Sequence, residues 1–203
     1  QEYLVLYRKH RPIAFDELAG QPHIVAALTK AIATNRIAHA YLFCGPRGVG
    51  KTTTARLMAR AIQCEAADAC KPCNKCARCD DAREGRAADI IEIDAASHRG
   101  IDEIRELREA VRFVPAQGKK KVYIIDEVHM LTKEAFNALL KTLEEPPPHV
   151  VFVLATTEQE IVPATIISRT QRYDFRRPTV EDITHRLADV AKREKLALDA
   201  DAA

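Results

Sequence analysis

The segment that points most directly to chemistry is a glycine-rich run that ends in a lysine and a threonine. Residues 45–52 read GPRGVGKT and fit the P-loop pattern G-x-x-x-x-G-K-[ST] at every fixed position. Backbone N–H groups of such a loop converge on phosphates, and the following helix adds the partial positive charge of its N-terminus. We expect Lys51 to reach the β- and γ-phosphates and Thr52 to ligate Mg²⁺. The expected nucleotide-binding residues of this segment are Gly45, Pro46, Arg47, Gly48, Val49, Gly50, Lys51, Thr52 and Thr53.

Two adjacent carboxylates supply a second half to this site. Asp126 and Glu127 follow the apolar run Val122–Ile125, at the end of a predicted strand, where ligands of open α/β sheets bind. Asp126 suits the Mg²⁺ shell, and Glu127 is placed to polarise a water for attack on the γ-phosphate. An acidic pair after a strand is by itself more often a solvated turn. The preceding P-loop favours the catalytic interpretation, so ATP hydrolysis is predicted.

Five of the six cysteines crowd into one short segment, which reads Cys64, Cys70, Cys73, Cys76 and Cys79. Four thiolates at about 2.3 Å from one Zn²⁺ form a tetrahedral site, and C-x-x-C spacing brings two of them onto one ion. Such a site would stabilise an insertion too small for its own core. A redox dithiol is the main alternative. Spacing alone leaves open whether Cys64 or Cys70 is a ligand, and Cys44 is predicted to be a buried strand residue.

Apolar runs alternate with amphipathic stretches along most of the chain. The predicted strands are Ala40–Cys44, Asp89–Ile93, Lys121–Ile125, Val150–Ala155 and Gln171–Phe175. Predicted helices cover Thr53–Ile62, the stretch around Ile101–Val111, and a segment from about Thr132 to the prolines at 146–148. This alternation predicts a parallel five-stranded sheet with helices on both faces. From Pro178 the pattern becomes purely helical, with Thr179 as a candidate cap.

Bulk composition is that of a globular protein with a small formal net charge of +2. A charge this small does not argue for nucleic acid by itself, so DNA contact would need a local basic patch or several subunits. No apolar run approaches the roughly 18 residues that span a bilayer, and the basic N-terminus has no secretory h-region. We expect a cytoplasmic protein. The chain lacks an initiator Met and ends within a helical region, which suggests a piece of a longer chain.

Together these features resemble the bacterial DNA polymerase III gamma/tau family, the AAA+ ATPases of the replicative clamp loader. The resemblance runs along nearly the whole chain, and its most telling part is the cysteine insertion, which generic AAA+ proteins lack. Besides the P-loop, it rests on residues 7–12 (YRKHRP), 20–21 (GQ), 39–43 (HAYLF), 92–97 (EIDAAS), 126–131 (DEVHML), 137–141 (NALLK) and 144–147 (EEPP).

The resemblance assigns further roles. The family's zinc pattern C-x8-C-x2-C-x2-C maps onto Cys64, Cys73, Cys76 and Cys79, and leaves Cys70 without a ligand role. Its sensor-1 hydroxyl falls on Thr157, with Thr156 as the alternative. Its Ser-Arg-Cys segment corresponds to residues 168–170, in which Arg169 would act on ATP held by a neighbouring subunit and Thr170 departs from the usual Cys. The segment that packs near the base and sugar would include Arg8, Arg11 and Pro12.

The implied architecture is an AAA+ nucleotide-binding domain over residues 1–177, with a zinc module inserted at about 64–79, and the start of a helical lid over 178–203. The implied function is loading a sliding clamp onto primed DNA, using ATP, Mg²⁺ and Zn²⁺, without a polymerase active site in this chain. Partners would be delta, delta prime and further gamma/tau copies in a pentameric ring, the clamp and primer-template DNA. Arg99 and Arg105 are candidates for phosphate contact or for an ordinary solvated helix face. A different AAA+ machine and a scaffold subunit without turnover are the alternatives.

Overall fold

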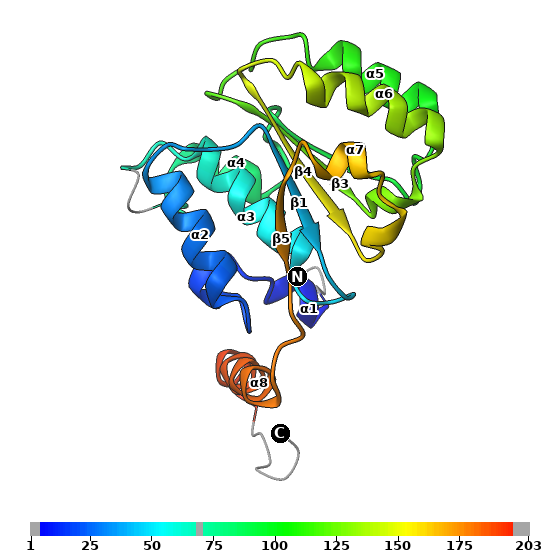
Figure 1. Ribbon diagram of the computed structural model, residues 1–203. Helices are drawn as coiled ribbons and strands as arrows, with labels where there is room; N and C mark the ends of the chain where they lie inside the picture. The colour runs from blue at the N-terminus through cyan, green and yellow to red at the C-terminus, as the bar shows by residue number, and fades with distance from the viewer. Residues whose placement is uncertain (1–4, 68–70, 197–203) are drawn as a thin grey trace.

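A parallel sheet forms the centre of the molecule (Figure 1). The computed structural model describes residues 5–67 and 71–196. Its five strands run in the order β2-β3-β4-β1-β5, and every neighbouring pair is parallel. The strands are β1 Ala40–Cys44, β2 Ile90–Asp94, β3 Lys121–Asp126, β4 Val150–Thr156 and β5 Gln171–Asp174. Because all strands point the same way, the segments that follow β1, β3 and β4 meet at one edge of the sheet.

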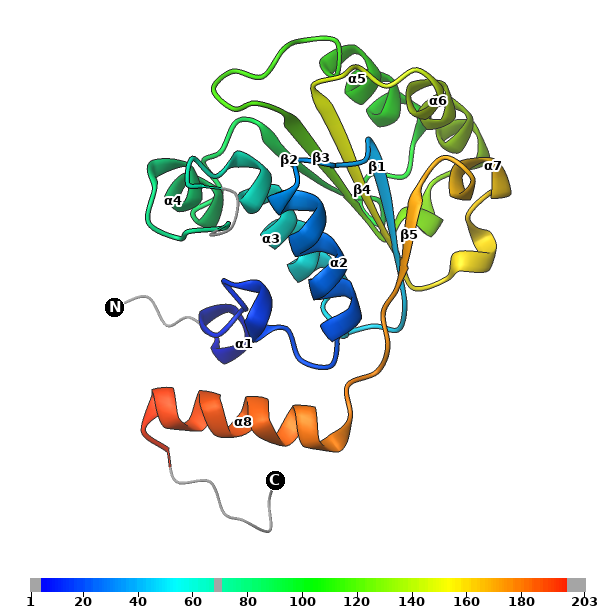
Figure 2. The same cartoon turned by 60° about the vertical axis from the view of Figure 1, so that its left-hand side comes forward.

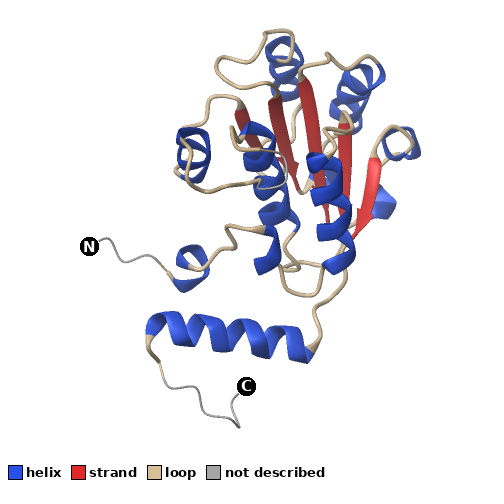
Figure 3. Cartoon of the chain, turned by 90° about the vertical axis from the view of Figure 1, so that its left-hand side faces the viewer, coloured by secondary structure: helices blue, strands red, loops and turns tan. Residues whose placement is uncertain are grey.

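Helices cover both faces of the sheet, as Figures 1 and 3 show. The α-helices are α1 Leu6–Lys9, α2 Pro22–Ala33, α3 Lys51–Gln63, α4 Ala77–Arg83, α5 Ile101–Ala110, α6 Lys133–Glu144, α7 Ala164–Ile167 and α8 Val180–Glu194. Short 3₁₀ helices in the described part of the chain are η1 Phe15–Glu17, η3 Val128–Met130 and η4 Gln159–Ile161. Among the described residues, no helix is both long and apolar enough to span a membrane.

Two hydrophobic cores lie on opposite faces of the sheet, because successive side chains of a strand alternate between its faces. On one face Leu42 and Phe152 pack with Leu139 of α6, in the core that α5, α6 and α7 cover. On the other face Phe43 packs with Met58, in the core that α2 and α3 cover. The central strands β1 and β4 are buried along their whole length. The sheet is therefore a rigid platform for the segments that leave its carboxyl edge.

The fold confirms the predicted class and its five strands, with small differences at the ends. The second strand begins at Ile90 rather than Asp89, and the Asp89 carboxylate accepts N–H groups from residues 116–118. The P-loop helix begins at Lys51, two residues before the predicted start. Helix α2, at Pro22–Ala33, was not predicted, although it starts with a proline at its first turn and buries Ile24, Leu28 and Ile32 at helical spacing.

The last helix, α8, lies apart from the sheet and beside the N-terminal segment (Figure 2). Thr179 caps it as predicted, in a capping box with Asp182. Glu194 at its other end lies 2.5 Å from His10 Nε2 and 2.6 Å from Lys9 Nζ. These contacts join α8 to the segment that precedes the sheet. The division of the chain near residue 178 into two domains stays a prediction.

Candidate nucleotide site and cysteine cluster

The P-loop joins the end of β1 to the start of α3, and its glycines have backbone angles that suit few other residues. Gly48 and Gly50 have φ values of 81° and 97°, in the left-handed region. At Gly45 there is also no space, since an added Cβ would lie 2.6 Å from the carbonyl oxygen of Phe175. At Gly48 an added Cβ would meet nothing within 4 Å, so there the backbone angle and not a lack of space favours glycine.

Lys51 lies under this loop rather than in solvent. The residue is 6% exposed. Its Nζ donates to the carbonyl oxygens of Gly45 at 2.7 Å and Pro46 at 2.8 Å. Burial lowers the pKa of Lys51, while the nearby carboxylates of Glu127 and Asp126 act in the opposite direction. The loop therefore holds a positive charge at the N-terminus of α3 beside the two acidic residues.

Thr52 and Asp126 come together from different elements. The Thr52 hydroxyl, in the first turn of α3, donates to Asp126 Oδ2 at the end of β3, at 2.6 Å. Two oxygen ligands of one octahedral Mg²⁺, each at about 2.1 Å, lie about 3 Å apart. The donor set is also the one that Mg²⁺ prefers, a carboxylate with a hydroxyl and room for phosphate oxygens and water. The two residues thus fit a shared magnesium site.

Glu127 sits next to this pair on a strained backbone. Its φ and ψ of 49° and 46° place a non-glycine residue in the left-handed region, and its N–H donates to Asp126 Oδ1 at 3.0 Å. Its side-chain Oε2 accepts a hydrogen bond from Thr157 Oγ1 at 3.2 Å. Of the two threonines that sequence reasoning considered, Thr157 is the one in contact with Glu127. Thr156 instead lies within 3.1 Å of His129 Nδ1.

His129 is a functional candidate that sequence reasoning missed. Its Nδ1 lies 3.5 Å from Glu127 Oε2, and its Nε2 lies 3.4 Å from Glu158 Oε1. The side chain is 7% exposed, so this ring is enclosed between the ends of β3 and β4. Its place two residues after Glu127 was the available sequence signal. A buried imidazole in this position can hold the Glu127 carboxylate in one orientation.

Beside the start of α3 is a cavity of about 530 Å³. Thr53, Arg11 and Pro12 all line it, so the structure brings the predicted N-terminal residues to the P-loop helix. Arg8 belongs to α1, and its side chain lies outside the described part of the structure. A third wall comes from α4, through Ala82 and Arg83. The cavity is thus enclosed by the N-terminal segment, the P-loop helix and the cysteine module.

Arg169 lies at the opposite edge of the sheet from the P-loop. It follows α7 and precedes β5, whereas the P-loop follows the end of the parallel strand β1. Its guanidinium contacts Glu144 Oε1 and the carbonyl oxygen of Thr165, each at 2.8 Å. Arg169 and the P-loop lysine therefore do not meet within one chain. Arg99 and Arg105 are both exposed, and Arg105 is paired with Asp102 at 3.1 Å.

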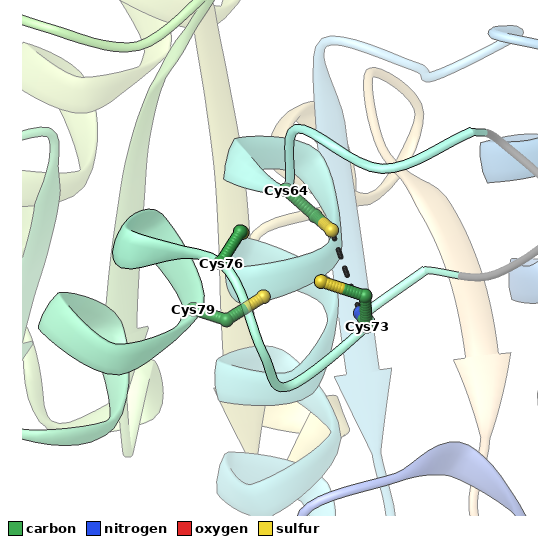
Figure 4. Close-up of side chains that lie close together, drawn as sticks. All are labelled: Cys64, Cys73, Cys76 and Cys79. Atoms are coloured by element: carbon green, nitrogen blue, oxygen red, sulfur yellow. Dashed lines mark hydrogen bonds between the residues drawn. The ribbon is translucent and has the colours of Figure 1, made fainter.

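Four cysteines converge at the far end of α3 (Figure 4). Cys64 ends α3, Cys73 comes from the following loop, Cys76 is the N-cap of α4, and Cys79 lies in its first turn. Their sulfur atoms all lie within 4.8 Å of one another. Four sulfurs at about 2.3 Å from one tetrahedral Zn²⁺ would lie about 3.8 Å apart, so a small contraction accommodates the ion. Cys70 lies outside the described residues.

Backbone N–H groups surround the sulfur atoms of this cluster. Cys64 Sγ accepts from the N–H groups of Cys73 at 3.4 Å and Ala66 at 3.5 Å. A hydrogen bond from the Lys75 N–H lowers the pKa of Cys73 to about 7, whereas burial raises the pKa of Cys64 and Cys79. Burying several thiolates together is unfavourable without a cation. The donor set, its spacing and these N–H groups fit a structural zinc site.

Comparisons with known proteins agree with this geometry. A family described as "DNA polymerase III, delta subunit" matches residues 20–179. DNA polymerase III subunit tau of Bacillus subtilis is 52% identical over 97% of this chain and 35% of the relative. The tau subunit of Escherichia coli is 48% identical over 96% of this chain and 30% of the relative. The chain thus spans about a third of the length of these curated relatives.

The fold of this chain is similar to that of a solved structure. The RuvB Holliday junction branch migration motor of Thermotoga maritima has a TM-score of 0.66 and 21% sequence identity, over 93% of this chain and 56% of that chain. At this identity the likeness shows the AAA+ fold alone. The family match covers most of the chain, and the curated relatives confirm the resemblance to gamma/tau subunits. The chain belongs to the DNA polymerase III, delta subunit family, in which its relatives at 45–52% identity are tau and gamma/tau subunits.

Proposed function

We propose that this chain is the nucleotide-binding part of a clamp-loader ATPase, which uses ATP to load a sliding clamp onto primed DNA. The observation that supports it best is the hydrogen bond of 2.6 Å between Thr52 and Asp126. This bond joins the P-loop to the end of β3 at the point where a nucleotide-bound Mg²⁺ would need both ligands. The family relationship supplies the clamp-loader context.

In the proposed mechanism, the P-loop N–H groups and Lys51 bind the β- and γ-phosphates. Lys51 would exchange its two carbonyl acceptors in the loop for phosphate oxygens when ATP enters. Bound Mg²⁺, held by Thr52 and Asp126, supplies positive charge against the phosphates. Arg11, Pro12 and Thr53 line the cavity that would take the nucleoside. Arg8 is proposed to belong to the same segment.

Glu127 would act as the general base on the attacking water. It lies directly after the magnesium-binding Asp126, and Thr157 donates to its Oε2 at 3.2 Å. Thr157 can therefore hold the carboxylate, and then the water, in line with the γ-phosphate. When the water loses its proton to Glu127, its oxygen bonds to the γ-phosphorus while the bond from phosphorus to the bridging oxygen breaks, leaving ADP and phosphate.

Arg169 would complete the site of a neighbouring subunit in a ring. Its position at the edge of the sheet opposite the P-loop supports action between chains, because it has no access to its own P-loop. The proposed ring contains delta, delta prime and further gamma/tau copies, and it binds the clamp and primer-template DNA in the cytoplasm. Zn²⁺ on Cys64, Cys73, Cys76 and Cys79 is proposed to be structural.

Clamp- and DNA-stimulated ATPase activity of the full-length protein tests this function. The protein is assembled with the other loader subunits, the clamp and primed DNA, and compared with its Arg169→Ala variant. We expect stimulation in the unmodified assembly and a loss of about 10³-fold or more in the variant, as for arginine fingers in GTPases. Arg36→Ala, an exposed arginine after α2, is the matched control. An unmodified assembly that clamp and DNA do not stimulate would refute the proposal.

A further inference from the structure

Besides the wall that α4 forms, the cysteine module contacts the N-terminal wall of the proposed nucleotide cavity through a cluster of Arg60, Asn74 and the carbonyl group of Ile13. Arg60 Nη1 donates to Asn74 Oδ1 at 3.0 Å and to the Ile13 oxygen at 3.3 Å. The Asn74 amide in turn donates to the same Ile13 oxygen at 2.9 Å. The three residues come from α3, the cysteine loop and the N-terminal segment. We call them the Asn74 cluster.

Each member of the Asn74 cluster lies next to a part of the proposed nucleotide site or of the proposed zinc site. Ile13 directly follows Arg11 and Pro12 and lines the cavity with them. Asn74 lies between the candidate ligands Cys73 and Cys76, and its backbone N–H bonds to Cys79. Arg60 is on the same helix as Lys51 and Thr53. A change in the cysteine loop would therefore move the Asn74 amide that donates to the Ile13 carbonyl group. The wall of the cavity at Ile13 would move with it.

The electrostatic state of Arg60 adds a second reason for coupling. The residue is 8% exposed, and its Nε is buried with no hydrogen-bond partner among the described residues. Arg60 contacts Asn74, the neighbour of Cys73 in the sequence, so its guanidinium lies close to the candidate ligands. Four thiolates around Zn²⁺ would have a net charge of −2, which favours a buried guanidinium beside them. Occupancy of the cysteines thus affects the residue that contacts Ile13.

We propose that the Asn74 cluster couples metal binding in the cysteine module to nucleotide binding in the cavity walled by the N-terminal segment. Asn74 is a positioning residue in this scheme, because it acts through the Ile13 carbonyl group. Arg60 contacts the same carbonyl group and also lines the cavity. The inference rests on the proposed nucleotide and zinc sites, and it adds a relation between them. Because coupling is reciprocal, zinc must tighten nucleotide binding by the factor by which nucleotide tightens zinc binding.

The variant that tests the cluster must remove the side-chain amide group of Asn74 and keep the backbone conformation at this position. Asn74 has a φ of 57°, so replacement by alanine would add backbone strain, whereas Asn74→Gly keeps this conformation accessible. Asn35→Gly is the matched control, since Asn35 has a φ of 52° and is exposed after α2, away from the cavity. Arg60→Ala is a second variant, which approaches the cluster from α3 and leaves the cysteine loop intact.

The experiment uses the full-length protein under reducing conditions. ADP affinity is measured by calorimetry with the zinc-loaded and zinc-stripped protein, and zinc affinity by competition with a chromophoric chelator, with and without ADP. We expect each ligand to tighten the other by about fivefold or more, the lower end of typical couplings. Asn74→Gly and Arg60→Ala should each reduce this factor to about one while both ligands still bind, whereas Asn35→Gly keeps it.

Two results would overturn the inference. One is an equal ADP affinity of the zinc-loaded and zinc-stripped protein; the other is full coupling in both Asn74→Gly and Arg60→Ala. Either would leave the proposed function intact, because nucleotide and zinc would still bind. A protein that binds no ADP in any state would instead refute the proposed nucleotide site. Circular dichroism of the stripped protein shows whether the sheet survives, so that a loss of affinity is assigned to coupling and not to unfolding.

Discussion

The two ends of helix α3 hold two different kinds of site. At its N-terminus the P-loop begins the helix with Lys51, and at its C-terminus Cys64 ends it, 13 helical residues or about 20 Å away. The N-terminal end is fixed by the sheet, whose buried strands deliver Asp126 and Thr157 to it. The other end leads into a loop and the seven-residue helix α4, in which Cys79 is the only buried residue.

The difference teaches how each end is stabilised. At the proposed nucleotide site the side chains are held by protein contacts, since Thr52 contacts Asp126 and Thr157 contacts Glu127. Its partial positive helix charge suits phosphates. The cysteine end carries the partial negative charge of a helix C-terminus, and this charge disfavours thiolates such as that of Cys64. A bound cation reverses this repulsion, so we infer that the module depends on metal while the P-loop does not.

Removal of a zinc ligand should have the largest effect and should stay local. In the Cys79→Ser variant we expect zinc content to fall from about one ion per chain to near zero, because structural sites need all four ligands. Residues 71–84 should then lose protection from amide hydrogen exchange, since zinc can supply about 10–16 kcal/mol to small domains. Strands β3 and β4 should keep their protection. Mass spectrometry of the exchanged peptides measures both regions.

Cys70→Ser is the matched control for this change. The family pattern leaves Cys70 without a ligand role, so this variant should retain zinc and the protection of residues 71–84. If Cys79→Ser retained zinc, or if the sheet lost protection together with the module, the separation between the two ends of α3 would be refuted.

Replacement of Glu127 by Gln probes the other end of the helix. We expect Glu127→Gln to bind ATP with little change while its turnover falls by about 10²–10⁴-fold, the usual contribution of a general base. The amide keeps the size of the side chain and an acceptor for Thr157, but it cannot take a proton from water. Filter binding of ATP and steady-state release of phosphate by the assembled loader separate the two effects.

Glu134→Gln controls for the loss of one negative charge, since Glu134 is exposed in the first turn of α6. Turnover that survives in Glu127→Gln would remove the assignment of Glu127 as general base. Zinc content should be the same in both variants, because Glu127 and Glu134 belong neither to the cysteine module nor to the Asn74 cluster.

Sequence reasoning located these regions unequally, and the cause is physical. The P-loop, Asp126 and the strands lie in local patterns, in which residue type and spacing define backbone and burial. Asn74, Arg60 and Ile13 come from three separate segments, and their spacing in the sequence does not predict that they are in contact. For His129 the sequence showed only its place two residues after Glu127, because its partners Thr156 and Glu158 lie at the end of a different strand. Helix α2 has a regular pattern, with Ile24, Leu28 and Ile32 at helical spacing, so its position could have been predicted from the sequence.

Asp89 offers the smallest and most specific test of how the C-terminal end of α3 is joined to the sheet. Its carboxylate is 4% exposed and accepts N–H groups of Ala116 at 2.7 Å, Gln117 at 2.9 Å and Gly118 at 2.6 Å. Burial alone would raise the pKa of Asp89, but these three donors outweigh it and lower the pKa below its ordinary value of 3.8. The same loop holds Gln63 of α3, whose Nε2 donates to the Lys120 oxygen at 2.6 Å.

We expect Asp89→Asn to lower the free energy of unfolding by about 1–3 kcal/mol at neutral pH, because an amide cannot accept all three donors. The sign with pH follows from the lowered pKa. The folded state binds the proton less readily than the unfolded state, so the stabilisation is fully present above pH 3.8 and is lost as the pH falls through the folded-state pKa. Urea unfolding across this range should show the two proteins converging in acid. A difference in stability that does not change with pH would show that the charge of Asp89 does not stabilise this loop.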